Sequence, residues 1–377
     1  MTPEDILTEL IAFRSVVGQP NAAIATWIAD YLGRCGVEAQ LLPGPEGDRS
    51  NLFATIGPRN VAGLVLSGHM DVVPAEEPQW SADPFQLRAE RDRLFGRGTS
   101  DMKGFLAAAL AIVPSLVASK PVRPIHLAFS YDEEAGCRGV PHLIAALPSL
   151  CARPAAAVIG EPSGLRPILA HKGKAAARVE VHGKSGHSSR PDLGLNAIHA
   201  MGRVIAAADE AAAQASIGPL DPVFEPPYST VQIGTIRGGE ALNVIPERCV
   251  VEIEARAIAG ASPDLLLEPV RSTLASLERQ GFRTVWQPIA AYPALSLEAE
   301  APIARLLSRV TGEAPLAAVS YGTEAGLYQA AGIDAIICGP GDIARAHKPD
   351  EYITRGELAA CADMLERLCM QFAREPS

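Results

Sequence analysis

The chain lacks the features that mark membrane, secreted and nucleic-acid-binding proteins. Its 377 residues contain no apolar run of membrane-spanning length, and the first residues lack the basic segment and apolar stretch of a signal peptide. The seven cysteines are odd in number and show no paired Cys-x-x-Cys spacing, so we expect reduced, mostly buried thiols. The formal net charge of -10 disfavours a nucleic acid or an anionic membrane as partner. We therefore expect a soluble, cytoplasmic protein.

Length and composition predict a folded protein of two domains. A chain of 377 residues is too long for one small hydrophobic core. Hydrophobic residues make up 48% of the sequence and charged residues 20%, which is an ordinary balance for a globular protein. The sequence shows no internal repeat and no low-complexity tail.

Strand-like and helical segments alternate over most of the chain. The strand-like segments are 37–42, 52–56, 64–67, 124–130 and 155–160, and the helical ones are 3–11, 22–35, 103–118, 137–147 and 354–373. This alternation predicts an α/β fold with a mainly parallel sheet sandwiched by helices. In such folds the functional residues gather in loops at the carboxyl ends of the strands.

A stretch of different character interrupts this pattern between residues 173 and 287. It combines alternating, half-exposed strand patterns with a polar tract at 183–189 and a helical segment at 195–214. We read it as an inserted α+β domain of ordinary size. The expected organisation is a catalytic domain made of residues 1–172 and 288–377, and an inserted domain made of residues 173–287.

A histidine and a carboxylate follow the apolar strand predicted at residues 64–67. Side chains two positions apart in an extended chain point to the same face, so His69 and Asp71 can share one site. His69 could bind a metal through one ring nitrogen, while Asp71 fixes its surroundings. The pair alone is a weak signal, because a lone histidine is more often structural than a ligand.

Further polar residues occur at equivalent places in the predicted fold. They are Asp101 in a glycine-punctuated loop, Glu133, Glu134 and Glu161 after predicted strands, and His347 late in the chain. Two histidines with three carboxylates suit two zinc ions about 3.5–4 Å apart that share one bridging carboxylate, an arrangement used for hydrolysis. In a Glu-Glu pair, one carboxylate can bind metal while its neighbour takes a proton from water.

These motifs together resemble those of the dizinc aminoacylase and carboxypeptidase family known as the M20 metallopeptidases. The resemblance covers nearly the whole chain, and five motifs occur in the family's order: His69-x-Asp71, 98–104, 132–134, 160–162 and His347. It implies a zinc aminopeptidase/carboxypeptidase-like fold that carries an inserted lid and dimerisation domain.

The resemblance also implies a ligand set for two zinc ions. His69, Asp101 and Glu161 would hold one ion, and Asp101, Glu134 and His347 would hold the other, with Asp101 as the bridge. Cobalt or manganese could occupy the same ligands. Residues of this kind would make the protein a metal-dependent hydrolase.

Roles in catalysis follow from the same resemblance. Glu133 would be the general base and later the acid, and Asp71 would orient His69. The peptide bond between Asp101 and Met102 is expected to be cis, as is usual after the bridging aspartate in this family.

The insert supplies a second set of candidate residues. His187 lies in a motif that resembles the family's lid, whose histidine reaches across a dimer to stabilise an oxyanion. The alternative for His187 is a solvated loop histidine. Asn243 and Arg256 match family positions that recognise a substrate carboxylate, a task that suits the planar guanidinium. The alternative for Arg256 is a surface salt bridge.

Three further assignments concern the substrate. Thr323 could donate to the substrate's carboxylate, and Glu324 could pair with its distal ammonium. Alternatively, Thr323 is a helix N-cap and Glu324 an acidic residue of the first turn. Lys172 could contact a carboxylate or could be a solvated charge.

Within the family, the motifs are most similar to those of the deacetylases that act on N2-acetyl-L-ornithine. The matching stretches are 67–74, 80–85, 131–137, 171–173 and 346–352. The similarity implies hydrolysis of N2-acetyl-L-ornithine to L-ornithine and acetate in arginine biosynthesis, by a homodimer. Two alternatives remain: the same chemistry on N-acetylcitrulline, N-succinyl-diaminopimelate or a dipeptide, and a catalytically dead homologue that binds or regulates.

Overall fold

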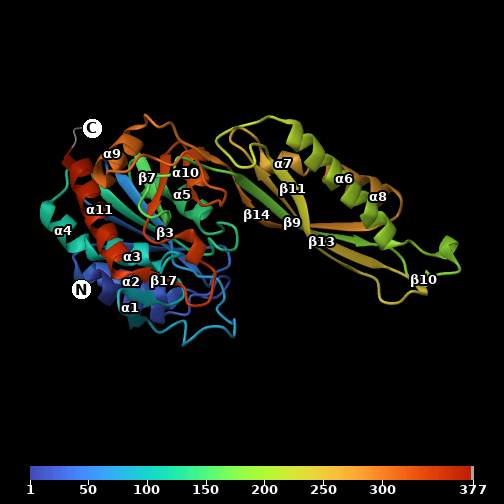
Figure 1. Ribbon diagram of the computed structural model, residues 1–377, viewed down its shortest axis with the longest axis horizontal. Coiled ribbons are helices and arrows are strands. Elements are labelled where there is room, and N and C mark those ends of the chain that lie inside the picture. The colour runs from blue at the N-terminus through green and yellow to red at the C-terminus, as the bar shows by residue number, and fades with distance from the viewer. Residues whose placement is uncertain (375–377) are drawn as a thin grey trace. The chain divides into compact units, whose positions relative to one another are not determined.

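The computed structural model describes residues 1–374, and the chain divides into two compact units (Figure 1). Unit 1 contains Met1–Ala170, Ser296–Ala317 and the chain from Thr323 onward. Unit 2 contains His171–Leu295 and Ala318–Gly322. Within the described residues, no helix combines the length and the apolar character that crossing a membrane requires.

Unit 2 is longer than the insert that the sequence predicts. The prediction ends at residue 287, whereas the unit continues to Leu295. The extension arises because strand β14 (Arg283–Tyr292) remains paired with β9 (Gly173–His182) up to the register pair Tyr292↔Lys174, with one register shift between Pro288 and Ala290. The short segment Ala318–Gly322 also belongs to unit 2 and has no counterpart in the prediction.

Unit 1 is built on a six-stranded sheet of strand order β1-β2-β6-β3-β7-β16. The bounds are β1 (Ala39–Pro43), β2 (Ser50–Ile56), β3 (Leu64–His69), β6 (Ile125–Ser130), β7 (Ala156–Pro162) and β16 (Asp334–Gly339). The strands from β6 to β16 run parallel, while β1 and β2 pair antiparallel at one edge. The predicted mainly parallel sheet is therefore confirmed, and β3, β6 and β7 end at the same edge.

Helices cover this sheet on both faces (Figure 1). One layer contains α1 (Pro3–Ala12), α2 (Ala22–Arg34), α3 (Lys103–Ala111), α4 (Val113–Ser119), α9 (Pro302–Thr311) and α11 (Arg355–Arg374), and its apolar side chains form one buried core with the strands. The other layer contains α5 (Val140–Leu150) and α10 (Ala325–Ala330). A small sheet of β4 (Arg88–Glu90), β5 (Arg93–Phe95) and β17 (Tyr352–Thr354) completes the unit.

The helix that follows Asp101 differs from the prediction and lies unusually close to the sheet. The sequence predicts one helix over 103–118, but the structure breaks it at Ile112, because Pro114 opens a second helix, α4. Every residue of α3 except the last is buried. An added Cβ at Gly160 in β7 would lie 2.0 Å from the ring of Phe105, so this ring packs directly on the backbone of the strand.

Unit 2 is a four-stranded antiparallel sheet with helices on one face (Figure 1). Its strand order is β11 (Thr230–Gly238), β13 (Arg248–Ala257), β9, β14. The helices are α6 (Ala197–Ile217), α7 (Pro263–Leu266) and α8 (Glu268–Arg279), and a small ribbon pairs β10 (Gly186–His187) with β12 (Val244–Ile245). Along β9, buried side chains alternate with half-buried ones, as expected for a sheet with one face in the core.

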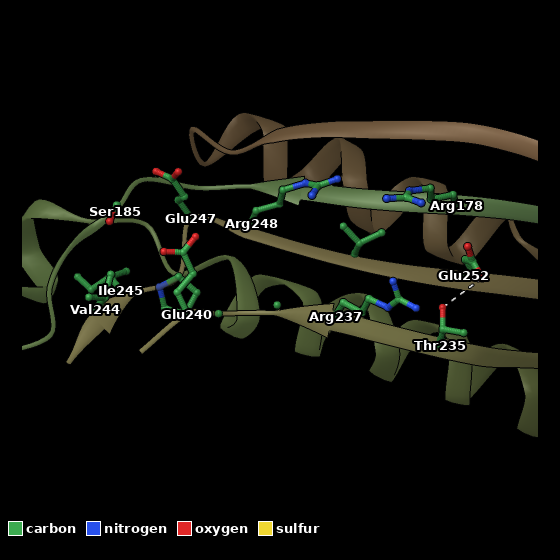
Figure 2. Close-up of a pocket in the computed structure, with 14 residues that line it drawn as sticks. Arg178, Ser185, Thr235, Arg237, Glu240, Val244, Ile245, Glu247, Arg248 and Glu252 are labelled. Atoms are coloured by element: carbon green, nitrogen blue, oxygen red, sulfur yellow. Dashed lines mark hydrogen bonds between the residues drawn. The ribbon is translucent and has the colours of Figure 1, made fainter. Parts of the chain in front are cut away.

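A hollow lies on the other face of this sheet (Figure 2). Arg178, Arg237 and Arg248 line it together with acidic side chains, and the Thr235 hydroxyl donates to Glu252 at 3.2 Å. Its described lining belongs entirely to unit 2. Because charges of both signs alternate there, the hollow is a polar sheet face rather than a cluster of metal ligands.

Substitution of Leu274 by alanine should reduce the free energy of unfolding by about 2–5 kcal/mol, since large-to-small changes in a packed core remove contacts and leave a cavity. Leu274 in α8 is 4% exposed and belongs to the core of unit 2. Leu265→Ala is a matched control, because Leu265 is 70% exposed, and its effect should stay within about 0.5 kcal/mol. Urea unfolding measures the free energy of unfolding of both variants. Equal losses of stability in the two variants would contradict a separate core in unit 2.

Candidate metal centre and catalytic base

Unit 1 brings the predicted metal ligands together at the carboxyl edge of its sheet. Strand β3 ends at His69, β7 carries Glu161 next to its end, and the segment after β6 carries Glu133 and Glu134. Asp101 lies just before α3, and His347 lies in the loop between β16 and β17. The peptide between Asp101 and Met102 is cis, which confirms the expectation from the resemblance.

Asp101 stands between the two histidines. Its Oδ1 lies 3.0 Å from His69 Nε2, and its Oδ2 lies 3.2 Å from His347 Nε2. Glu161 Oε1 is 3.9 Å from His69 Nε2, and Glu134 Oε1 is 2.9 Å from His347 Nε2. One carboxylate that turns its two oxygens toward two different histidines has the geometry of a bridging ligand.

Among the described residues, two groups of three side chains each offer ligand atoms that all lie within 4.8 Å of one another inside the group. One group is His69, Asp101 and Glu134, and the other is His69, Glu133 and Glu161. The expected division puts Glu134 with His347 and leaves Glu133 outside both ligand sets. The geometry thus gathers the same residues and places the expected general base beside the ligands, but the division between two ions stays a prediction.

The electrostatics of this cluster favour bound cations. Burial raises the pKa of Glu133 to about 8, and burial together with neighbouring carboxylates raises the pKa of Glu161 well above its ordinary value. Hydrogen bonds with Asp101 and Glu134 raise the pKa of His347 to about 10. Carboxylates crowded in a buried place bind positive charge strongly, and imidazole nitrogens with carboxylate oxygens are donors that zinc accepts. The residues therefore fit a site for two divalent cations.

Asp71 contacts His69 mainly through its backbone, and the implied role of its side chain stays a prediction. His69 Nδ1 lies 2.9 Å from the backbone carbonyl of Asp71 but 3.7 Å from its Oδ1, so the backbone orients the ring and leaves Nε2 facing Asp101. The Asp71 carboxylate instead accepts the backbone N–H groups of Glu133 and Glu134, each at 3.1 Å. Its side chain thus holds the turn that carries the expected base and a ligand.

Cys137 is a contact of the base that the sequence analysis does not identify. Its thiol donates to Glu133 Oε1 at 3.2 Å, and the residue is 2% exposed. From the sequence alone, Cys137 is expected only to be a buried thiol. The signal for this contact in the sequence is the position of Cys137, four residues after Glu133 and directly after Gly136.

Thr323 and Glu324 are both buried in unit 1. Thr323 Oγ1 accepts the backbone N–H of Ala325 at 3.0 Å. The N-cap of α10 is Glu324, however, so the alternative that makes Thr323 the N-cap and Glu324 a first-turn residue is wrong. Glu324 is 1% exposed and accepts hydrogen bonds from the hydroxyls of Ser67 and Ser130, and burial raises its pKa. In this conformation Glu324 serves internal hydroxyl groups, so the geometry gives no support to a contact with a substrate ammonium.

His187 and Asn243 lie side by side in unit 2. The backbone N–H of Ser188 donates to the carbonyl of Asn243 at 3.0 Å, next to the pairing of β10 with β12. The side chain of His187 is exposed, and its Nδ1 lies 2.8 Å from Ser189 Oγ. Both residues are therefore presented at the surface of unit 2.

Arg256 and Lys172, also in unit 2, have partners within the protein. Arg256 is half-buried, with its Nε 3.3 Å from Glu254 Oε1, which is the ion pair that the alternative expects. The Lys172 ammonium is largely buried and donates to the carbonyls of Pro226 and Tyr228 at 2.8 and 2.7 Å. The alternative of a solvated charge is therefore wrong for Lys172, which fastens a loop.

Known proteins resemble this chain over nearly its whole length. Residues 65–371 match the sequence model of peptidase family M20/M25/M40. The acetylornithine deacetylase of Myxococcus xanthus is 35% identical over 374 residues, which cover 97% of this chain and 96% of the relative. The acetylornithine deacetylase of Photorhabdus laumondii is 32% identical over 377 residues, covering 98% of this chain and 96% of the relative.

The fold agrees with solved structures of the same family. An M20 family metallo-carboxypeptidase from Sulfolobus solfataricus superposes with a TM-score of 0.80 at 19% identity, covering 98% of this chain and 99% of that one. At that identity the likeness concerns the fold alone. Together with the match to the family over most of the sequence, it shows that the chain belongs to peptidase family M20/M25/M40 and is a metal-dependent hydrolase.

Proposed function

We propose that the protein is a dizinc deacetylase that hydrolyses N2-acetyl-L-ornithine to L-ornithine and acetate, a step of arginine biosynthesis. The observation that carries the metal chemistry is the position of Asp101, with one oxygen toward each of His69 and His347. The substrate is inferred from the relatives named acetylornithine deacetylase, at 35% and 32% identity.

The proposed proton path runs through Glu133. Zinc at such a site polarises a carbonyl oxygen and lowers the pKa of water to near 7. Cys137 occupies Glu133 Oε1, so the proton of the attacking water would be taken at Oε2. The oxygen of that water would form a bond to the acetyl carbonyl carbon. Glu133 would then pass the proton to the amide nitrogen as the C–N bond breaks, which releases ornithine as the free amine and acetate. The Asp71 carboxylate keeps Glu133 in place by accepting the backbone N–H of Glu133.

We further propose a homodimer in which His187 stabilises the oxyanion in the partner subunit, while Asn243 and Arg256 bind the substrate carboxylate. Two features of unit 2 support an interface. Strand β11 lies at the edge of its sheet, and an unpaired edge strand readily pairs with another chain. Leu242 is fully exposed, and Ile236 in β11 is 54% exposed.

The substrate prediction is tested by measuring amine release from N-acetylornithine, N-acetylcitrulline and N-succinyl-diaminopimelate. The protein is first freed of metal and then assayed with and without added zinc. We expect zinc-dependent turnover that is highest on N-acetylornithine. Highest turnover on another substrate would replace the proposed substrate, and full zinc loading without turnover on any would favour a binding protein.

Glu133→Gln should lower kcat by about 10²–10⁴-fold, because it removes the proton acceptor while keeping the shape of the side chain. Metal content should stay at two ions per chain, measured by elemental analysis. The control is Glu38→Gln. The side chain of Glu38 is 82% exposed, and its ion pair with Arg59 is long, at 3.8 Å. Substantial turnover by Glu133→Gln would contradict the proposed path.

His187→Ala should lower kcat by about 10²–10³-fold, as expected when one donor to an oxyanion is lost, and should leave metal content unchanged. His199→Ala in the same unit is the control and should keep full activity. Loss of metal from His187→Ala would show that the proposed role of this histidine in stabilising the oxyanion is wrong. Sedimentation equilibrium tests the dimer, and a fully active monomer would contradict catalysis across subunits.

A further inference from the structure

Glu351 is a buried carboxylate that the proposed reaction does not use. It lies immediately before β17 and is 1% exposed. The segment that contains it also carries His347, four residues earlier.

The donors around Glu351 come from the loop that leads to Asp101. Its Oε1 accepts the backbone N–H groups of Ser100 at 2.8 Å and Asp101 at 3.0 Å. Its Oε2 accepts the backbone N–H of Gly98 at 3.1 Å and Arg97 Nη1 at 2.9 Å. Four donors therefore converge on one carboxylate, and one of them is the amide of the bridging residue itself.

Arg97 extends this contact to other parts of unit 1. Its side chain is 1% exposed, and its Nη1 also lies 3.4 Å from the carbonyl of Lys348, next to His347. Its Nη2 donates to the carbonyl of Pro74 at 3.2 Å, on the segment that follows Asp71. The Arg97–Glu351 pair thus joins the segments that carry His347, Asp101 and Asp71.

We propose that Glu351 is a positioning residue that holds Asp101 at the distance from His347 that binding of both metal ions requires. The proposal rests on the proposed dinuclear function. A purely structural role explains the contacts less well, because a buried ion pair contributes little net stability once the cost of removing two charges from water is counted. Groups that orient metal ligands, in contrast, typically change metal affinity about 10–100-fold when they are replaced.

Glu351→Gln tests this directly. The amide keeps the size of the side chain but puts an NH2 group where an oxygen accepts N–H donors, so the loop should lose its fixed position. Zinc titration of the metal-free protein against a competing chelator should show about 10–100-fold weaker binding. The visible absorption spectrum of the cobalt-loaded variant should also change, because it reports ligand geometry. Excess zinc should restore part of the turnover.

Glu357→Gln is the matched control. Glu357 also accepts a backbone N–H, from Thr354 at 2.8 Å, and pairs with Arg345 at 2.9 Å. It does not belong to the contacts of the loop at 97–101. Its replacement should lower the melting temperature of the metal-free protein, yet leave zinc affinity and the cobalt spectrum unchanged.

Unchanged zinc affinity and an unchanged cobalt spectrum in Glu351→Gln would overturn the proposal. If that variant does not fold, Arg97→Lys tests the proposal instead, since it keeps the positive charge but loses the forked contact with Glu351. Arg97→Lys should bind zinc several-fold more weakly than the wild type. Zinc affinity equal to that of the wild type would overturn the proposal. Failure of the proposed function looks different: wild-type protein that binds two zinc ions but hydrolyses no acylated amino acid refutes the deacetylase and leaves the role of Glu351 standing.

Discussion

The structure of unit 1 depends on negative charge concentrated at the carboxyl edge of its sheet. Asp101, Glu133, Glu134 and Glu161 converge there with two imidazoles. The oxygens of Asp101 and Glu134 lie 2.9–3.2 Å from imidazole nitrogens, and Glu161 lies 3.9 Å from His69. In their charged forms these carboxylates repel one another, so the cluster needs cations or protons to neutralise it and a firmly held backbone to stay together. The fold meets the second need with further carboxylates: Asp71 accepts two amides of the turn at 133–134, and Glu351 accepts three amides of the loop that ends at Asp101. Burial in both cases strengthens charge-assisted hydrogen bonds to N–H groups.

Much of the fold could be predicted from the sequence because it has local causes. Apolar runs such as 64–67 and 124–130 give buried parallel strands, and alternation over 177–182 gives a strand with one face in the core. The errors also have local or pairing causes. Pro114 divides the helix predicted over 103–118, a signal present in the sequence but not used. The end of unit 2 is set by the pairing of β14 with β9, which no local pattern reveals.

The ligand set could be expected from the resemblance to the family. His69, Asp101 and Glu161 lie near a strand end or just before a helix, whereas Glu134 and His347 lie in loops. The contacts that hold these ligands could not be predicted, because they join residues far apart in the sequence. Ser100 and Glu351 meet across 251 positions, and nothing near either residue announces the contact. Lys172 is a further example. Next to a histidine in the sequence, it is interpreted as a solvated or substrate-binding charge, whereas in the structure it donates to two carbonyls 54 and 56 positions away.

The direct contact between β7 and α3 has an evolutionary consequence. Gly160 precedes Glu161, and Phe105 lies on the helix that follows Asp101, so the missing side chain at position 160 sets how closely two of the ligands can approach. Even a methyl group there would lie 2.0 Å from the aromatic ring. Close-packed interiors do not absorb such an overlap without moving backbone. Position 160 is therefore closed to neutral drift, and a descendant of this protein could change it only together with Phe105.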